Sequence, residues 1–390
     1  MSNKLPTSGV DESIDEVLAL ENKLLSSSAP HDLKEESKLS IDRLKRMIRM
    51  GGYSSEFETV SKYIDWIVRV PWNSFSEDVL DIVSAKKIMD STHYGMESIK
   101  NLILDYLASM QLKKENYQKR DVIPTQFQVG VEENIQNRPV VKVEKQKIYT
   151  PVFLFVGLQG VGKTSIARSI AQSMNRKFAR ISLGAIGDVR TLRGTPRYSI
   201  DGEPGQIVKS LIRCGTMNPV ILLDEIEKSS ANTGLLNDVM ATLLEILDPE
   251  QNTSFIDHYI DYPIDLSNVM FICTANNLGG LSAALLDRVE VIRFTSYSDE
   301  EKKVIAKQYI LPEVLEEYNL TSNEIQISDD IWLSVIRPVG FDAGIRQLER
   351  NIATMIRSAA RKIVEGSPTP ISINNENLSE FLTVDQGPLS

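Results

Sequence analysis

Apolar residues recur at helical spacing through the first third of the chain. Residues 11–50 place one set of them on a single face, with charged residues elsewhere: Ile41, Leu44, Met47 and Ile48. The same spacing predicts further helices over residues 57–67, 83–89 and 96–112. Plain core packing explains these apolar positions, so residues 1–112 are interpreted as an N-terminal helical region.

The pattern changes in residues 113–149, which are polar and carry runs of charge with few large apolar residues. Their length exceeds that of ordinary connections, which usually have about 4–6 residues. We interpret this segment as a polar insertion or linker that forms a solvated loop. The alternative is an excursion that binds a partner.

Short apolar runs alternate with helical segments over residues 150–296. The runs that predict strands are residues 152–156, 177–183, 220–223, 269–274 and 289–294. Apolar strands bounded by helices are typical of a parallel sheet covered on both faces. The fold class is therefore α/β, with a parallel five-stranded sheet at its centre. Residues 297–390 turn mainly helical again, with small strands at 325–327 and 371–373, and form a separate subdomain with a tail.

The first apolar run leads directly into a glycine-rich turn and then into a helical pattern. This order carries the sequence G-x-x-x-x-G-K-[ST], the phosphate-binding loop of nucleotide-binding proteins. Its glycines let backbone N–H groups face the phosphates at the positive end of the helix. Lys163 then reaches the β- and γ-phosphates of ATP, and the Thr164 hydroxyl ligates Mg²⁺. The predicted nucleotide-binding residues of the loop are Gly157, Gly160, Gly162, Lys163, Thr164 and Ser165.

Two acids follow the apolar run at residues 220–223. Asp224 fits the further hard oxygen ligand that Mg²⁺ needs beside the Thr164 hydroxyl. Glu225 can polarise the attacking water, because hydrolysis requires a base within hydrogen-bond reach. An acidic pair after a strand is common by chance, but downstream of a phosphate-binding loop it indicates ATP hydrolysis.

Composition narrows the class of protein. The chain has 390 residues, of which 42% are hydrophobic and 25% charged, as in a globular protein with ample core. The net charge of −10 does not indicate a nucleic-acid partner. No apolar run approaches the roughly eighteen residues of a membrane span, and the N-terminus lacks a secretory h-region. Cys214 and Cys273 are interpreted as core thiols of a reducing, intracellular compartment, with the cytoplasm favoured over the peroxisomal matrix or the mitochondrion.

Taken together, these segments resemble the ATPase module of the Lon family of AAA+ proteins, from about residue 12 to about residue 383 outside the polar insertion. The matches in the ATPase are residues 157–165, 222–226, 243–252, 257–259, 274–276, 284–288 and 343–350. The preceding helical segment matches at residues 63–66, 71–72 and 93–95. The run Leu247-Asp-Pro-Glu-Gln-Asn252 is unusually specific to this family, whereas the phosphate-binding loop alone is not. The resemblance implies an AAA+ fold, with residues 297–390 as the helical lid.

The resemblance also implies roles for three residues. Asn276 corresponds to sensor 1, which orients the hydrolytic water, and Arg346 corresponds to sensor 2, which contacts phosphate within its own subunit. Arg288 corresponds to the arginine finger, which reaches the γ-phosphate of a neighbouring subunit and stabilises the charge that builds there. The plainer alternatives are a capping asparagine, a surface arginine and an arginine at a helix end. An arginine acting on a neighbour implies a ring of identical subunits, and the family implies a hexamer.

The sequence also departs from the family. The chain ends at Ser390 without the domain that carries the serine–lysine dyad, and no G-x-S-x-G replaces it, so we expect no peptide hydrolysis by this chain itself. In the loop that grips substrate in the family, Ser199 stands where the aromatic residue belongs. Tyr198 lies one place earlier, while Ile200 keeps its place. We predict that Tyr198 and Ile200 contact substrate; the alternative is that Tyr198 packs against its own subunit.

Three functions remain open from the sequence. The first is a Lon-like motor that hydrolyses ATP and unfolds or remodels polypeptides. The second is a fragment or subunit of an ATP-dependent Lon-type serine protease, which would act with a separate protease or Lon-type subunit. The third is a nucleotide-dependent scaffold or adaptor ring. The complete set of predicted ATPase residues favours the first two. The displaced aromatic residue in the substrate-gripping loop favours the third.

Overall fold

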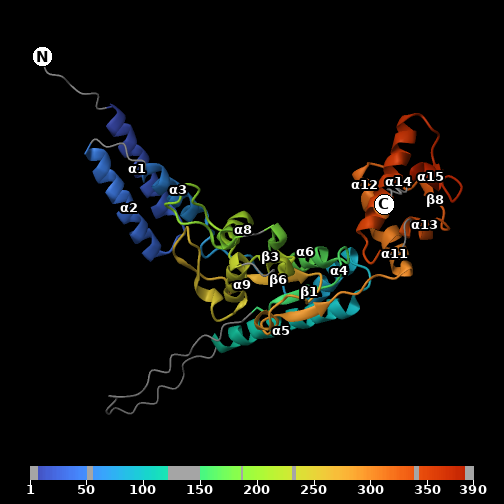
Figure 1. The fold of residues 1–390 in the computed structure, drawn as a ribbon, viewed down its shortest axis with the longest axis horizontal. Coiled ribbons are helices and arrows are strands. Elements are labelled where there is room, and N and C mark those ends of the chain that lie inside the picture. Colours follow the sequence, from blue (N-terminus) through green and yellow to red (C-terminus); the bar gives the residue numbers. More distant parts are fainter. Residues whose placement is uncertain are drawn as a thin grey trace, which may run out of the picture.

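The computed structural model describes residues 8–50, 56–121, 150–185, 188–230, 234–337 and 342–382. Its first elements are α1 (Ser8–Ser26), α2 (His31–Arg49), α3 (Glu56–Arg69), α4 (Ile82–Thr92) and α5 (Glu97–Asp121). Helices α1 to α3 pack together at one end of the molecule, whereas α4 and α5 lie beside the sheet (Figure 1). The predicted helical region is therefore confirmed, and its first pattern divides into two helices at the turn before Pro30.

Helix α5 continues beyond the predicted end of its pattern at residue 112 and reaches Asp121. Its first half is anchored by buried Ile103 and Leu107. The polar extension contains three Lys residues with one Glu, one Gln and one Arg, all good helix formers. The segment predicted as an insertion over residues 113–149 thus begins as helix. The rest of that prediction, residues 122–149, lies outside the described residues.

The central sheet has the strand order β2-β3-β6-β1-β7, and all of its pairs are parallel. The strands are β1 (Phe153–Val156), β2 (Phe178–Ser182), β3 (Val220–Asp224), β6 (Met270–Ala275) and β7 (Glu290–Arg293). Each lies within one of the five predicted runs or within a residue of it, so the predicted α/β fold with a five-stranded parallel sheet is confirmed. Because parallel strands end at one edge, the residues after β1, β3 and β6 meet there, where ligands of such sheets bind.

The two faces of the sheet bury two different sets of side chains. Phe153 and Phe155 of β1 point into one core, and Leu154 between them points into the other; all are fully buried. Alternation with period two is what a pleated strand imposes. The first core includes α4, α5 and α6 (Lys163–Ser173), and the second includes α8 (Gln206–Cys214) and α9 (Gly234–Leu247). Burying each such side chain stabilises the fold by about 1.5–3 kcal/mol.

Shorter elements connect the strands. They are η1 (Leu183–Ala185), α7 (Val189–Arg193), η2 (Ile226–Ser230), η3 (Asn252–Ser254), β4 (Phe255–Ile256), β5 (Pro263–Ile264) and α10 (Ala283–Leu286). Strands β4 and β5 form a small antiparallel pair. Of the two cysteines, Cys273 is buried in β6 and Cys214 is half-buried at the end of α8, and both are free thiols.

The last subdomain lies at the opposite end of the molecule from α1–α3 (Figure 1). It consists of α11 (Asp299–Ile305), the π-helical η4 (Ala306–Ile310), α12 (Leu311–Glu317), β8 (Ile325–Ile327), α13 (Trp332–Ile336), α14 (Arg346–Val364), β9 (Ile371–Ile373) and α15 (Leu378–Phe381). Strands β8 and β9 are the predicted small strands and pair in parallel. Ser298 and Glu301 form a capping box that starts α11. Within the described parts of the chain, no helix is both long and apolar enough to cross a membrane.

Candidate functional site

A cleft of about 540 Å³ lies at the carboxyl edge of the sheet. Its walls come from the turn after β1 with the start of α6, from the ends of β3 and β6, from the end of α4, and from the lid at α12 and α14. Gly160 and Gly162 have φ values of 79° and 93°, in the left-handed region that favours glycine. Gly162 is also the N-cap of α6, so the loop turns its backbone into the cleft at the positive end of the helix.

Lys163 extends across this loop toward the end of β6. Its Nζ donates hydrogen bonds to the carbonyl of Gly157, to the carbonyl of Leu158 at 3.1 Å and to Oδ1 of Asn276 at 3.2 Å. Burial lowers the pKa of Lys163. The loop therefore holds one ammonium group in the cleft, at the position that the phosphate-binding motif predicts for contact with a triphosphate.

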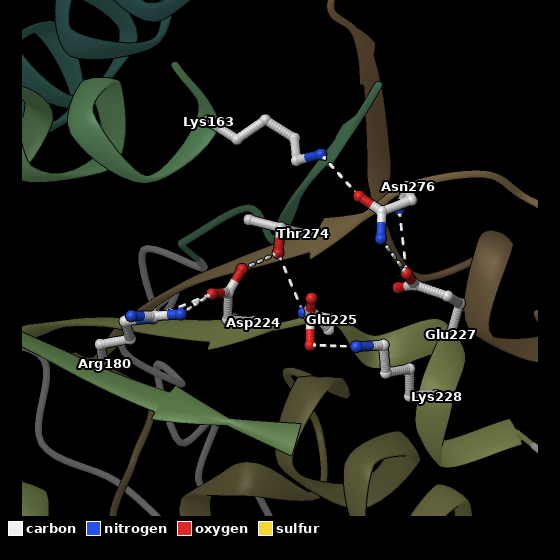
Figure 2. A network of polar contacts seen from close by, with 8 residues as sticks. All are labelled: Lys163, Arg180, Asp224, Glu225, Glu227, Lys228, Thr274 and Asn276. Atoms are coloured by element: carbon white, nitrogen blue, oxygen red, sulfur yellow. Dashed lines mark hydrogen bonds and ion pairs between the residues drawn. The ribbon is translucent and has the colours of Figure 1, made fainter. Parts of the chain in front are cut away.

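Asp224 ends β3 and faces the cleft with both carboxylate oxygens engaged (Figure 2). Oδ2 accepts from Nε of Arg180 at 2.9 Å, and Oδ1 accepts from the hydroxyl of Thr274. Thr164 lines the same cleft. A carboxylate and a hydroxyl are hard oxygen donors, which Mg²⁺ prefers, so these two residues fit the predicted metal role.

Glu225 follows with an unusual backbone conformation. Its φ of 61° lies in the left-handed region, which costs a non-glycine residue about 1–3 kcal/mol and persists only where the surroundings impose it. The backbone N–H of Glu225 donates to Thr274 Oγ1 at 3.0 Å, and its Oε2 accepts from Nζ of Lys228 at 2.7 Å. The hydrogen bond to Glu225 raises the pKa of Lys228. The turn thus directs the Glu225 carboxylate to the rim of the cleft.

Glu227 is a site residue that sequence reasoning missed. Its Oε1 accepts from both the backbone N–H of Asn276 at 3.2 Å and the side-chain Nδ2 at 2.8 Å (Figure 2). These bonds orient the amide so that its Oδ1 faces Lys163. The only signal in the sequence was the position of Glu227 two residues after Glu225, which says nothing about its partner. Asn276 itself lies in the cleft, where its predicted role requires it.

The N-terminal helical region also reaches the cleft. Nε2 of His93 lies 2.9 Å from Oγ of Ser165, and Nδ1 lies 2.8 Å from Oγ1 of Thr92, which in turn lies 3.0 Å from Oγ of Ser169. Burial, together with the nearby Lys100 ammonium, lowers the pKa of His93 to about 4. The imidazole is therefore neutral at pH 7. In the sequence, His93 belongs to a segment that resembles the Lon family, but that resemblance predicted no role for it.

The low pKa of His93 predicts a loss of stability in acid. Between pH 6.5 and 4 the unfolded chain binds a proton that the folded chain excludes, so this contribution is present above pH 6.5 and disappears as the pH falls through that window. Urea unfolding should show about 2–3 kcal/mol less stability at pH 4.5 than at pH 7.5 from this group. His93→Gln should reduce that difference by the same amount. An unchanged pH dependence in the variant would contradict the assignment.

The lid joins the phosphate-binding loop through its backbone. The N–H of Ile345 donates to the carbonyl of Gly160 at 3.0 Å, and a Cβ at Gly344 would lie 2.6 Å from the carbonyl of Gln159. Arg346, the first residue of α14, follows directly and lines the cleft. Burial raises the pKa of Glu349, another cleft residue on the same helix. The predicted sensor 2 residue is therefore held beside the loop within one subunit.

Arg288 stands apart from these residues and does not line the cleft of its own chain. Its Nη1 donates to the carbonyl of Ala284 at 2.8 Å, and its Nε and Nη2 donate to Oδ2 of Asp248 at 3.2 and 3.1 Å. A guanidinium outside its own cleft is the arrangement that the predicted action on a neighbouring subunit requires.

Tyr198 and Ile200 lie on the loop between α7 and α8, away from the cleft. The loop is closed at its base, where the N–H of Thr195 donates to the carbonyl of Glu203 at 3.0 Å. Tyr198 is 79% exposed and Ile200 is fully exposed. The Arg197 guanidinium lies 5.5 Å from the centre of the Tyr198 ring. Tyr198 borders a small depression of about 110 Å³ beside α2 and α3, and most of its side chain is exposed.

Comparison with known proteins gives two family matches. The model of the ATPase family associated with various cellular activities (AAA) matches residues 153–297, and that of the Lon protease AAA+ ATPase lid domain matches residues 316–371. The first match coincides with the sheet and its connecting helices, and the second lies within the lid.

Several whole-chain relatives are Lon proteases. Lon protease 2 of Thermus thermophilus is 40% identical over 373 residues, which is 95% of this chain and 43% of the relative. The Lon protease of Lawsonia intracellularis is 40% identical over 96% of this chain and 40% of its own length. Lon protease 1 of Bacillus subtilis is 36% identical over 94% of this chain and 43% of its own length. The chain spans less than half the length of these relatives. It belongs to the Lon family of AAA+ proteins and carries the ATPase module of that family.

Proposed function

We propose that this chain binds ATP with Mg²⁺ and hydrolyses it as a subunit of a ring, most simply a hexamer, that unfolds or remodels polypeptides. The observation that carries the proposal is the convergence in one cleft of a loop lysine, two strand-end acids and a lid arginine. These groups come from segments far apart in the sequence, and a structural role alone does not account for gathering them in a polar cleft of this size.

Each residue of the cleft takes one part of the reaction. Lys163 binds the β- and γ-phosphates, and backbone N–H groups of the loop support the same oxygens. Thr164 and Asp224 hold Mg²⁺, which neutralises charge on the phosphates when it is bound. Arg346 contacts phosphate from the lid. Glu225 and Asn276 act on the attacking water.

Glu225 accepts the proton of the attacking water. Its Oε2 accepts a hydrogen bond from Lys228, so the proposal gives this role to the other carboxylate oxygen, Oε1. Asn276 orients the same water. Glu227 supports this role because it fixes the rotation of the Asn276 side-chain amide. Arg288 completes the site from the neighbouring subunit, where a guanidinium stabilises the charge of the transition state.

The exposed loop supports action on polypeptides. The exposed side chains of Tyr198 and Ile200 can bury apolar area against a polypeptide that passes them, whatever its sequence. Asp257 anchors this loop, since its Oδ2 accepts from the N–H of Gly205 at 2.7 Å beside the loop base. The altered position of the aromatic residue is thus compatible with a gripping loop.

Removing the aromatic group should separate the two activities. Tyr198→Ala is expected to slow ATP-dependent unfolding of a tagged substrate about 10–100-fold, since burying an aromatic side chain stabilises the grip by about 1.5–3 kcal/mol. ATPase activity should stay within about twofold because the loop is outside the cleft. Phe75→Ala removes another exposed aromatic ring and serves as the control. Equal unfolding rates for parent and Tyr198→Ala would favour the scaffold hypothesis.

A second candidate function is the ATPase part of a longer or split Lon-type protease. The named relatives are Lon proteases, and the chain matches less than half of their length. Peptide release from an unfolded substrate, measured with the chain alone and after adding the protease domain of a relative, distinguishes the candidates. We expect no release by the chain alone, and release only in the mixture would support the second candidate.

A further inference from the structure

The run Leu247-Asp-Pro-Glu-Gln-Asn252 has no part in the cleft, although the sequence singled it out. It begins where α9 ends at Leu247 and folds into a turn around Asp248. The backbone carbonyl of Asp248 accepts from the N–H groups of Gln251 at 3.1 Å and Asn252 at 2.9 Å. The turn is therefore closed on Asp248 itself.

The same turn fixes the carboxylate of Asp248. Oδ1 accepts from the N–H of Glu250 at 2.9 Å, and Oδ2 accepts from Nε2 of Gln251 at 2.9 Å. The pKa of Asp248 is lowered by the Glu250 backbone bond first, and further by Gln251 and Arg288. A carboxylate that is bonded on both oxygens by its own turn has little freedom to rotate.

This carboxylate holds Arg288, a residue 40 positions away in the sequence. Nε and Nη2 of Arg288 both donate to Asp248 Oδ2, and Nη1 donates to the carbonyl of Ala284. A guanidinium has five N–H donors, so these three bonds leave about one N–H free on each Nη. The Arg288 side chain remains 31% exposed, against 16% for Asp248, so the arginine is the more accessible partner of the pair.

We propose that Asp248 is the positioning residue of the arginine that one subunit lends to the next. The inference rests on the proposed function, in which Arg288 acts on the neighbouring triphosphate. Asp248 and Ala284 restrain the long side chain before the neighbour engages it, and two N–H donors remain to bind phosphate oxygens. An arginine that is fixed in advance loses less rotamer freedom on binding, which is how positioning accelerates a reaction.

The alternative is an ordinary ion pair that only stabilises its own subunit. Partly exposed pairs of this kind contribute little to stability. The two roles differ in the place where they act. A stabilising pair supports the subunit that contains it, whereas a positioning residue affects hydrolysis in the adjacent subunit. Rings that contain two kinds of subunit can therefore separate them.

Homogeneous rings give the first measurement. Asp248→Ala should lower kcat for ATP hydrolysis roughly tenfold to thirtyfold, because the free rotamers of an arginine return, and should change KM less than twofold. If Asp248→Ala folds poorly, Asp248→Asn takes its place in these measurements. Asparagine keeps an acceptor for the Glu250 N–H and therefore preserves the turn. Glu250→Ala, which removes an exposed acid from the same turn, should retain parental activity. The double variant Asp248→Ala/Arg288→Ala should be no slower than Arg288→Ala alone.

Mixed rings give the decisive measurement. Glu225→Gln subunits are expected to hydrolyse ATP about 10²–10⁴-fold more slowly but keep Arg288, so adding them to Arg288→Ala subunits should restore hydrolysis in the latter. Adding them to Asp248→Ala subunits should raise hydrolysis per Asp248→Ala subunit several-fold. If the mixture with Arg288→Ala subunits gained hydrolysis and the mixture with Asp248→Ala subunits did not, the positioning role of Asp248 would be overturned, while the action of Arg288 on the neighbouring subunit would stand. A gain in neither mixture would overturn action on the neighbour and the positioning role with it.

Discussion

Lys163→Ala is expected to weaken ATP binding about 10–100-fold, which is the largest effect on nucleotide affinity in this chain. Hydrogen bonds to charged groups contribute about 1.5–3 kcal/mol each, and the phosphates of ATP are anionic. Lys163 Nζ already lies among acceptors at the mouth of the loop, with Asn276 Oδ1 at 3.2 Å. Affinity should be measured by titration with a fluorescent ATP analogue.

The control is Lys177→Ala, which removes an exposed lysine that does not line the cleft. That variant should bind the analogue as the parent does. Thermal unfolding without nucleotide should be measured for both variants, so that a loss of binding is separated from a loss of fold. Equal affinity in Lys163→Ala and the parent would remove the basis for placing the triphosphate in this cleft.

Glu225→Gln is expected to lower the rate of ATP hydrolysis about 10²–10⁴-fold while nucleotide affinity changes little, since general-base catalysis contributes that much. Glutamine keeps the size of the side chain and can still accept a hydrogen bond from Lys228, but it does not accept a proton from water. The rate should be measured as phosphate release at saturating ATP and Mg²⁺, with affinity measured in parallel.

Glu290→Gln, at an exposed carboxylate on β7, is the matched control and should hydrolyse ATP at the parental rate. The variant Glu225→Gln should also accumulate bound ATP, which rapid filtration detects. If phosphate release by Glu225→Gln matched the parent, another group would have to act as the base, and Glu227, which lies two residues further along the chain and contacts Asn276, would be tested next.

The predicted strands and the phosphate-binding loop were found in the sequence because each depends on neighbours within a few residues. Phe153 and Phe155 are buried in one core and Leu154 in the other, because successive side chains of any strand point to opposite faces of the sheet. The predicted end of α5 at residue 112 was wrong, because a helix that leaves its core continues with polar residues of good helix propensity. Local composition does not separate such an extension from a polar loop.

The sequence by itself determined the α/β sheet, the loop around Lys163 and the acidic pair after β3, since contiguous residues encode them. The tertiary structure decided which distant groups meet: Glu227 with Asn276 across 49 positions, His93 with Ser165 across 72, and Asp248 with Arg288 across 40. These pairs depend on strand order, on the docking of α4 and on the turn after α9. No local pattern records them, because the side chains are brought together only when the apolar faces of separate elements are buried against one another.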